Sequence, residues 1–227
     1  AEPYIDIEIE PERLKPEIIN EAIRPPIDFK KLENVFNKKA TSYKFFWFIS
    51  FISLAKEKQS LNISYKDIVI RMAAIAWPIV FEDAIDLGNR DMMKKYLNVI
   101  VSKTTLIKTA SCGVVERYIS QHYSSQGIDK ILSPLLKNVP FRFLSPWISY
   151  TSDEDVINKT MLADYNGMYK ILKTGISINE EWWDYINNNY SNVSKFIMQS
   201  FISYLKNNNN EMKLLRLKTK GWPLIDK

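Results

Sequence analysis

The sequence predicts a mainly α-helical protein: a single multi-helix domain with a small β-hairpin and an extended N-terminal arm that contains a short strand. Apolar residues recur at helical spacing along most of the 227 residues, and 46% of the chain is hydrophobic, which is enough for a large core. Only 6 glycines occur, which disfavours a loop-rich β-sandwich and a glycine-rich phosphate loop. We expect an acidic arm at 1–26, a helical domain at 27–205 and a basic tail at 206–227.

The arm differs from the body in charge. Residues 1–26 hold seven acids and three bases, a net charge of −4. The formal net charge of the whole chain is +5, so residues 27–227 carry +9. Ile5, Ile7 and Ile9 alternate with acidic residues, which predicts a strand with one apolar face. A lone strand must pair with another, so these three isoleucines are candidate partner-binding residues for β-strand addition.

Helical spacing predicts the elements of the body in order. The expected helices cover residues 28–36, 43–58, 64–79, 93–107, 115–122, 128–136, 153–161 and 179–204. Pro78 should kink or end the third of these helices. Thr174 and Gly175 lie between two short apolar stretches, which predicts a hairpin within residues 168–178. The proline-bounded segment VPFRFLSPWI should be extended and buried, and residues 206–227 show no helical register of their own.

The cysteine content, the N-terminal residues and the length of the longest apolar run bear on the cellular compartment. Cys112 is the only cysteine, which excludes a disulfide within the chain and favours a reducing compartment. Residues 1–12 are acidic, unlike a secretory signal peptide. The apolar run at residues 45–55 is about half the roughly 20 residues that span a bilayer. We therefore expect a cytoplasmic protein with no membrane association.

The residues available for catalysis are few. His122 is the only histidine, and a zinc site needs three or four ligands. Cys112 and His122 would lie about 15 Å apart along a helix, too far for a Cys–His nucleophile pair. Among the acidic groups, Glu82, Asp83 and Asp86 are explained least well by helix capping, and a metal-dependent nuclease using them is a weaker alternative. We expect no catalytic residue set, no metal and no cofactor.

A basic and aromatic cluster in the tail is the main candidate for nucleic-acid binding. Basic residues and a tryptophan interleaved in this way are typical of contacts to a phosphate backbone and to stacked bases. The alternatives are a solubilising surface, and a tail that pairs with a segment outside this chain. With two arginines from the body, the candidate nucleic-acid-binding residues are Arg71, Arg142, Arg216, Lys218, Lys220 and Trp222.

Several stretches in a fixed order cover about residues 27–210. They read IDFKKLENVFNKKATSYKFFWFISFI, IVIRMAAIAWPIV, VPFRFLSPWI, MYKILKTGISINEEWWDYI and FISYLKNNNN. Together, in this order, they resemble the helical N-terminal region of a group of bacterial HNH endonuclease-domain proteins. The turn at 207–210 lacks the arginine and prolines of the family pattern. No histidine follows His122, so the two metal-binding histidines of an HNH motif have no counterpart here.

The resemblance implies a non-catalytic, DNA-associated accessory domain of an HNH-type nuclease or defence system, which positions DNA or regulates its cleavage. Its expected partners are DNA and a protein or nuclease domain. A protein-interaction subunit that recruits its partner through the acidic N-terminal arm is the alternative. Deletion of residues 1–26 would separate the two, because only the second role needs the arm.

Overall fold

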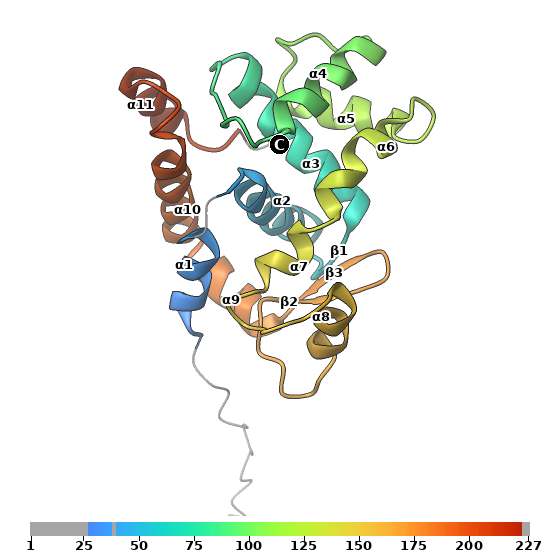
Figure 1. The fold of residues 1–227 in the computed structure, drawn as a ribbon, viewed down its shortest axis with the longest axis vertical. Helices are drawn as coiled ribbons and strands as arrows, with labels where there is room; N and C mark the ends of the chain where they lie inside the picture. The colour runs from blue at the N-terminus through green and yellow to red at the C-terminus, as the bar shows by residue number, and fades with distance from the viewer. Residues whose placement is uncertain (1–26, 38–39, 224–227) are drawn as a thin grey trace, which may run out of the picture.

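The computed structural model describes residues 27–37 and 40–223. The acidic arm, including Ile5, Ile7 and Ile9, lies outside the described residues. The described chain is mainly α-helical with a small antiparallel sheet, which confirms the predicted fold class (Figure 1). Within the described ranges, no helix is both long enough and apolar enough to cross a membrane.

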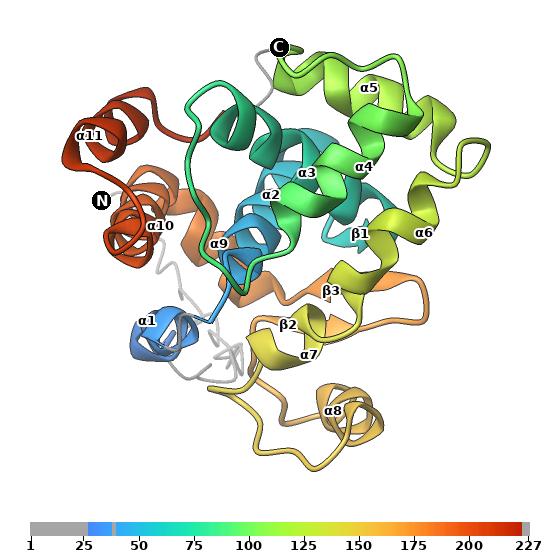
Figure 2. The ribbon, with the colours of Figure 1, turned by 45° about the horizontal axis from the view of Figure 1, so that its top comes forward.

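Two apolar helices pack against each other at the centre of the fold. Helix α2 (Tyr43–Lys58) is buried continuously from Phe45 to Ala55, and α3 (Tyr65–Phe81) is buried over most of its length. Apolar side chains cover every face of α2, so no face of this helix can be left to water. The remaining elements therefore surround the pair, as Figure 2 shows.

The surrounding helices follow the predicted order with some changes of boundary. They are α1 (Phe29–Asn37), α4 (Met93–Lys103), α5 (Cys112–His122), α6 (Ile128–Leu132), the 3-10 helix η1 (Ser133–Leu136), α7 (Val139–Phe143), α8 (Asp153–Thr160), α9 (Glu180–Asn188), α10 (Tyr190–Leu205) and α11 (Glu211–Lys220). Helix α3 continues through Pro78 for three further residues. The last long helix of the prediction is divided at Asn189 into α9 and α10.

Two segments that we expected to be irregular are helical. The segment VPFRFLSPWI contains α7, and its Pro140 lies in the first turn, where the missing N–H costs no helical hydrogen bond. The tail contains α11, whose N-terminus is capped by the Asn210 side chain accepting a hydrogen bond from the Lys213 N–H. Leu214 and Leu217 are buried, so packing of one apolar face stabilises α11.

The sheet confirms the predicted hairpin and adds a strand to it. Strands β2 (Tyr169–Ile171) and β3 (Gly175–Ile178) form the hairpin, and β1 (Asn62–Ser64) pairs with β3, giving the antiparallel order β1-β3-β2. The sequence gives no sign of β1, because its three residues form a strand only through pairing with β3 more than 100 positions away.

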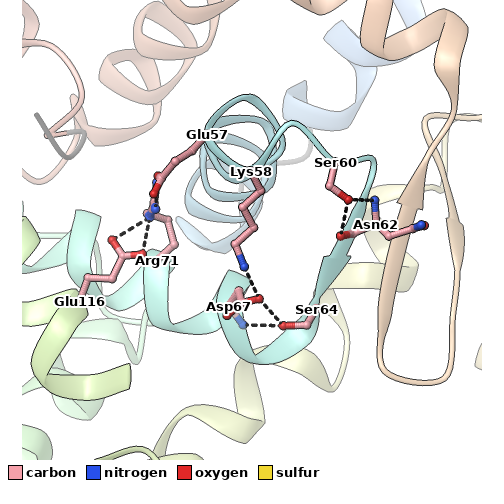
Figure 3. Close-up of polar contacts among 8 residues, drawn as sticks. All are labelled: Glu57, Lys58, Ser60, Asn62, Ser64, Asp67, Arg71 and Glu116. Carbon is pink, nitrogen blue, oxygen red and sulfur yellow. Dashed lines mark hydrogen bonds and ion pairs between the residues drawn. The ribbon is translucent and has the colours of Figure 1, made fainter. Parts of the chain in front are cut away.

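The outer edge of β1 is closed by a nearby hydroxyl group. The Asn62 N–H donates to Ser60 Oγ at 3.2 Å, and Ser60 Oγ donates to the Asn62 carbonyl oxygen at 3.3 Å, as Figure 3 shows. Leu61 instead faces β3, where its carbonyl accepts the Ile178 N–H. The backbone groups that Asn62 turns outward therefore already have partners within the chain.

The outer edge of β2 is closed in the same manner. The Ile171 N–H donates to Thr160 Oγ1 at 3.2 Å, and the Tyr165 hydroxyl donates to the Tyr169 carbonyl at 2.9 Å. A strand that added to either edge would have to displace these hydrogen bonds. The sheet is thus protected against the strand addition that exposed edges invite.

Gly175 provides a test of this packing. A Cβ at this position would collide with the Ile63 carbonyl oxygen and lie 2.9 Å from Ser64 Cα. Gly175→Ala should therefore push β1 away from β3 and lower the free energy of unfolding by about 1–3 kcal/mol. Urea denaturation checks this value, with Ser177→Ala in the same strand as the control. Equal stabilities of the two variants would contradict the close approach of β1.

Candidate nucleic-acid interface

Helix α11 is held against the chain that follows α3 by two lysines. Lys220 Nζ lies 2.8 Å from Glu82 Oε1 and 2.7 Å from Asp83 Oδ1. Lys213 Nζ donates to the Ala84 carbonyl at 2.8 Å. Because the Asp83 side chain is only 5% exposed, its carboxylate depends on Lys220 for compensation of its charge. Both lysines are therefore committed to positioning α11.

These contacts shift the pKa values of the paired groups in the expected directions. Hydrogen bonding to Lys220 and its positive charge lower the pKa of Glu82. Hydrogen bonds to Asp83 and Glu82 raise the pKa of Lys220. Glu82 therefore adds to the contact above the ordinary glutamate pKa, and its contribution is lost as the pH falls through the lowered value.

Trp222, predicted to stack on bases, belongs to the core. Its ring stacks on Phe201 with centroids 5.1 Å apart and meets Phe46 of α2 edge-on at 6.4 Å. Burial of this large side chain fixes the end of α11 to α2 and α10. The prediction that Trp222 contacts nucleic acid is wrong, because core rings occupy the space next to its face.

Arg216 and Lys218 remain exposed on α11. Arg216 is 66% exposed, with Nε 3.9 Å from Asp83 Oδ1, whereas Lys218 is two residues further along and therefore projects from another side of the helix. Met212 and Leu215 are each more than half exposed on the same helix. Neither of these two is among the sequence-predicted candidates. Once α11 is recognised as a helix, they form a second apolar stripe, distinct from the buried leucines.

Arg71 lies in the interior. It is 2% exposed, and its Nη2 lies 2.7 Å from Glu57 Oε2, while its Nε lies 2.8 Å from Glu116 Oε2 (Figure 3). Its Nη1 also donates to Ser53 Oγ at 3.2 Å. The guanidinium thus joins α2, α3 and α5. The prediction that Arg71 contacts phosphate is wrong, since a phosphate would have to replace these partners.

The acid groups around Arg71 respond to burial differently. Burial raises the pKa of Glu116, although the charge and hydrogen bond of Arg71 oppose the shift. Asp67 also experiences burial, but its hydrogen bonds from Lys58 and Ser64 lower its pKa. Lys58 Nζ lies 2.7 Å from Asp67 Oδ2 and links the end of α2 to the beginning of α3 (Figure 3). This cluster therefore stabilises the central helices.

Arg142 is exposed on α7 and is not brought to α11. Figure 1 shows α7 beside β2, whereas α11 lies at the end of α10 that is farther from α9. Of the predicted nucleic-acid-binding residues, the structure therefore leaves Arg216 and Lys218 exposed on one helix, although not on the same side of it. Lys220 supports them by positioning their helix.

The predicted acidic metal site does not assemble. Lys220 binds Glu82 and Asp83, and Asp86 Oδ1 instead accepts the Gly88 N–H at 2.8 Å. In the described part of the chain, no group of three or more His, Cys, Asp or Glu residues could hold a metal ion. The described structure therefore gives no support to a metal site at these three carboxylates.

The single histidine also has a structural environment. His122 Nδ1 lies 2.9 Å from the Tyr118 carbonyl oxygen, and its ring stacks on the Tyr118 ring at 4.3 Å. Cys112 is buried at the opposite end of α5. The two side chains therefore lie at opposite ends of one unbroken helix, too far apart to form a Cys–His pair.

Removal of the Arg71 side chain should destabilise the fold. Arg71→Ala leaves Glu116 and Glu57 without their cation, and we expect the free energy of unfolding to fall by about 3 kcal/mol. Arg117→Ala, an exposed arginine on α5, is the matched control and should change it by less than about 0.5 kcal/mol. Denaturant unfolding of both variants measures the difference. A loss at Arg71 no larger than at Arg117 would refute the cluster's stabilising role.

Loss of the Lys220 charge should loosen α11. In Lys220→Met the buried Asp83 carboxylate loses its nearest cation, and backbone amides of Leu214 and Leu217 should exchange with solvent about fivefold faster, equivalent to about 1 kcal/mol. Amide hydrogen exchange by NMR measures this change. Lys218→Met, on the same helix and exposed, should leave the exchange rates unaltered; faster exchange in both variants would contradict a specific role for Lys220.

Comparison with known proteins gives no match: no family model fits the chain, and no curated protein or solved structure matches it.

Proposed function

We propose that this protein is a DNA-associated accessory domain of an HNH-type nuclease or defence system, which positions DNA or regulates its cleavage without cutting it. The observation that supports DNA contact best is the pair of exposed cations, Arg216 and Lys218, on a helix fixed by Lys220. The order of sequence motifs supports the link to HNH-type proteins.

The arrangement of α11 suits contact with a phosphate backbone. Phosphate contacts need cations at fixed positions on a surface, and they orient a protein on a duplex without reading its sequence. Lys213 and Lys220 hold α11, so Arg216 and Lys218 lose less conformational freedom on binding than they would on a free tail. The charge of +9 over residues 27–227 adds a long-range attraction to DNA.

A protein-interaction role is the second candidate. The exposed Met212 and Leu215 support it, because a stripe of large apolar side chains in water is typical of a docking surface. The predicted acidic arm lies outside the described residues. Since hydroxyl groups close both edges of the described sheet, a strand of the arm would add to a sheet of the partner.

Charge reversal on α11 tests the DNA proposal. Arg216→Glu combined with Lys218→Glu should weaken binding to a DNA duplex at least tenfold and reduce the slope of log affinity against log salt concentration by about 2, because two phosphate contacts are lost. Fluorescence anisotropy of a labelled duplex over a salt series measures both quantities. Lys130→Glu combined with Lys137→Glu changes the net charge equally at exposed sites on and near α6, and should retain the wild-type slope.

Two results would overturn the proposal. The first is the absence of binding by the wild-type protein even at low salt. The second is an equal loss in both charge-reversed variants, which would indicate attraction by net charge alone. Met212→Gln combined with Leu215→Gln should preserve DNA affinity; loss of affinity in this variant, with no effect of the α11 charge reversal, would contradict the assignment of DNA contact to Arg216 and Lys218.

A further inference from the structure

A pocket of about 260 Å³ lies between the first residues of α1, the chain after α7, residues 163–166 and the first turn of α9. Figure 1 shows α9 at one end of α10 and α11 at the other, so the pocket is separate from the cationic surface of α11. Its volume is at the lower end of the range for small-molecule sites. It therefore has room for a group the size of one amino-acid side chain.

Three aromatic rings that the fold holds rigidly line this pocket. The Trp182 indole N–H donates to the Asn166 carbonyl at 3.1 Å, and the Tyr165 hydroxyl donates to the Tyr169 carbonyl at 2.9 Å. Trp147 packs edge-on against Trp182 with centroids 5.3 Å apart. Trp182 is only 2% exposed, so the half-buried rings of Trp147 and Tyr165 supply the aromatic surface that a ligand can reach.

The charges around the pocket favour a cation. Among the described residues that line it, Asp28 and Asp164 contribute carboxylates, as does Glu181, which also interacts elsewhere in the chain, and Lys31 contributes a positive charge. This balance repels phosphate and attracts a positively charged group. Aromatic faces attract cations through their quadrupole and add to the effect of the carboxylates. A guanidinium or ammonium group on an aliphatic stem fits both features.

The surface next to the pocket indicates where such a cation comes from. Met161 and Leu162 are each more than half exposed, and they directly precede the pocket-lining segment. The Leu162 carbonyl accepts the Tyr165 N–H at 3.2 Å, so the exposed leucine and the pocket tyrosine belong to one turn. A free small cation would leave this apolar surface exposed to water, whereas a polypeptide segment that binds there can bury it.

We propose that this pocket binds an arginine or lysine side chain of a protein partner, and that apolar residues flanking that side chain pack on Met161 and Leu162. The site does not depend on DNA binding by α11. The carboxylates provide selectivity for positive charge, the rings pack against the aliphatic stem, and the exposed residues at the end of α8 add contact area.

NMR of the indole N–H groups in the full chain tests the charge requirement. Nα-acetyl-arginine amide should shift the Trp147 and Trp182 indole resonances, and Nα-acetyl-citrulline amide, its neutral near-isostere, should not. Asp164→Asn should weaken arginine binding about two- to fivefold, as expected for one exposed charge pair. Asp184→Asn, an exposed acid on α9 outside the pocket, should have no effect. Equal shifts with citrulline, or none with arginine, would overturn the proposal.

Peptides test the source of the cation. An acetylated Leu-Arg-Leu peptide amide should bind more tightly than Ser-Arg-Ser, and Met161→Gln combined with Leu162→Gln should remove that difference while leaving Nα-acetyl-arginine amide affinity unchanged. Equal affinity of both peptides and the free amide would overturn the assignment to a protein partner. Displacement of the peptide by a DNA duplex would also overturn it, because the duplex would then occupy this pocket.

Discussion

The fold depends on the burial of α2 and α3. A helix that is apolar on all faces must be covered on all faces. The position of each other element therefore depends on which side of the α2–α3 pair it covers. The polar exception inside the pair is Arg71. A guanidinium buried in this position is tolerated only with compensating groups, and Glu57, Glu116 and Ser53 supply them. The requirement to satisfy one buried cation therefore fixes how α5 packs on the central helices.

The same requirement explains why the C-terminal segment is part of the domain. Phe46 of α2 and Phe201 of α10 would have an uncovered side without Trp222, and Asp83, which follows α3, would lose its nearest cation if Lys220 were absent. Closing the core thus uses one face of α11. The exposed side chains of Arg216 and Lys218 remain available for a partner.

Local pattern was sufficient for much of the fold. The apolar run of α2, the start of α3 near Ser64 and the Thr174–Gly175 hairpin could be predicted, because each depends on residues close in sequence. Strand β1 could not be predicted, because it forms only through pairing with β3. Helix α11 could not be predicted either, because Asp83 and Phe201, in other parts of the sequence, stabilise it. The candidate site shows the same division. Periodicity alone cannot distinguish an arginine that binds Glu116 from one that faces solvent.

The distribution of charge links the two proposed surfaces. Under the two proposals, the cations of α11 would attract a duplex, whereas the carboxylates around Trp147 and Trp182 would repel one, and α10 separates the two regions. Complementary potentials orient a protein before contacts form, so a duplex approaching this domain would meet α11 first and would be directed away from the pocket. The pocket would then remain accessible to a basic segment of a protein partner while DNA is bound. Such a domain would hold DNA and a protein at once, which is the geometry that the proposed positioning role requires.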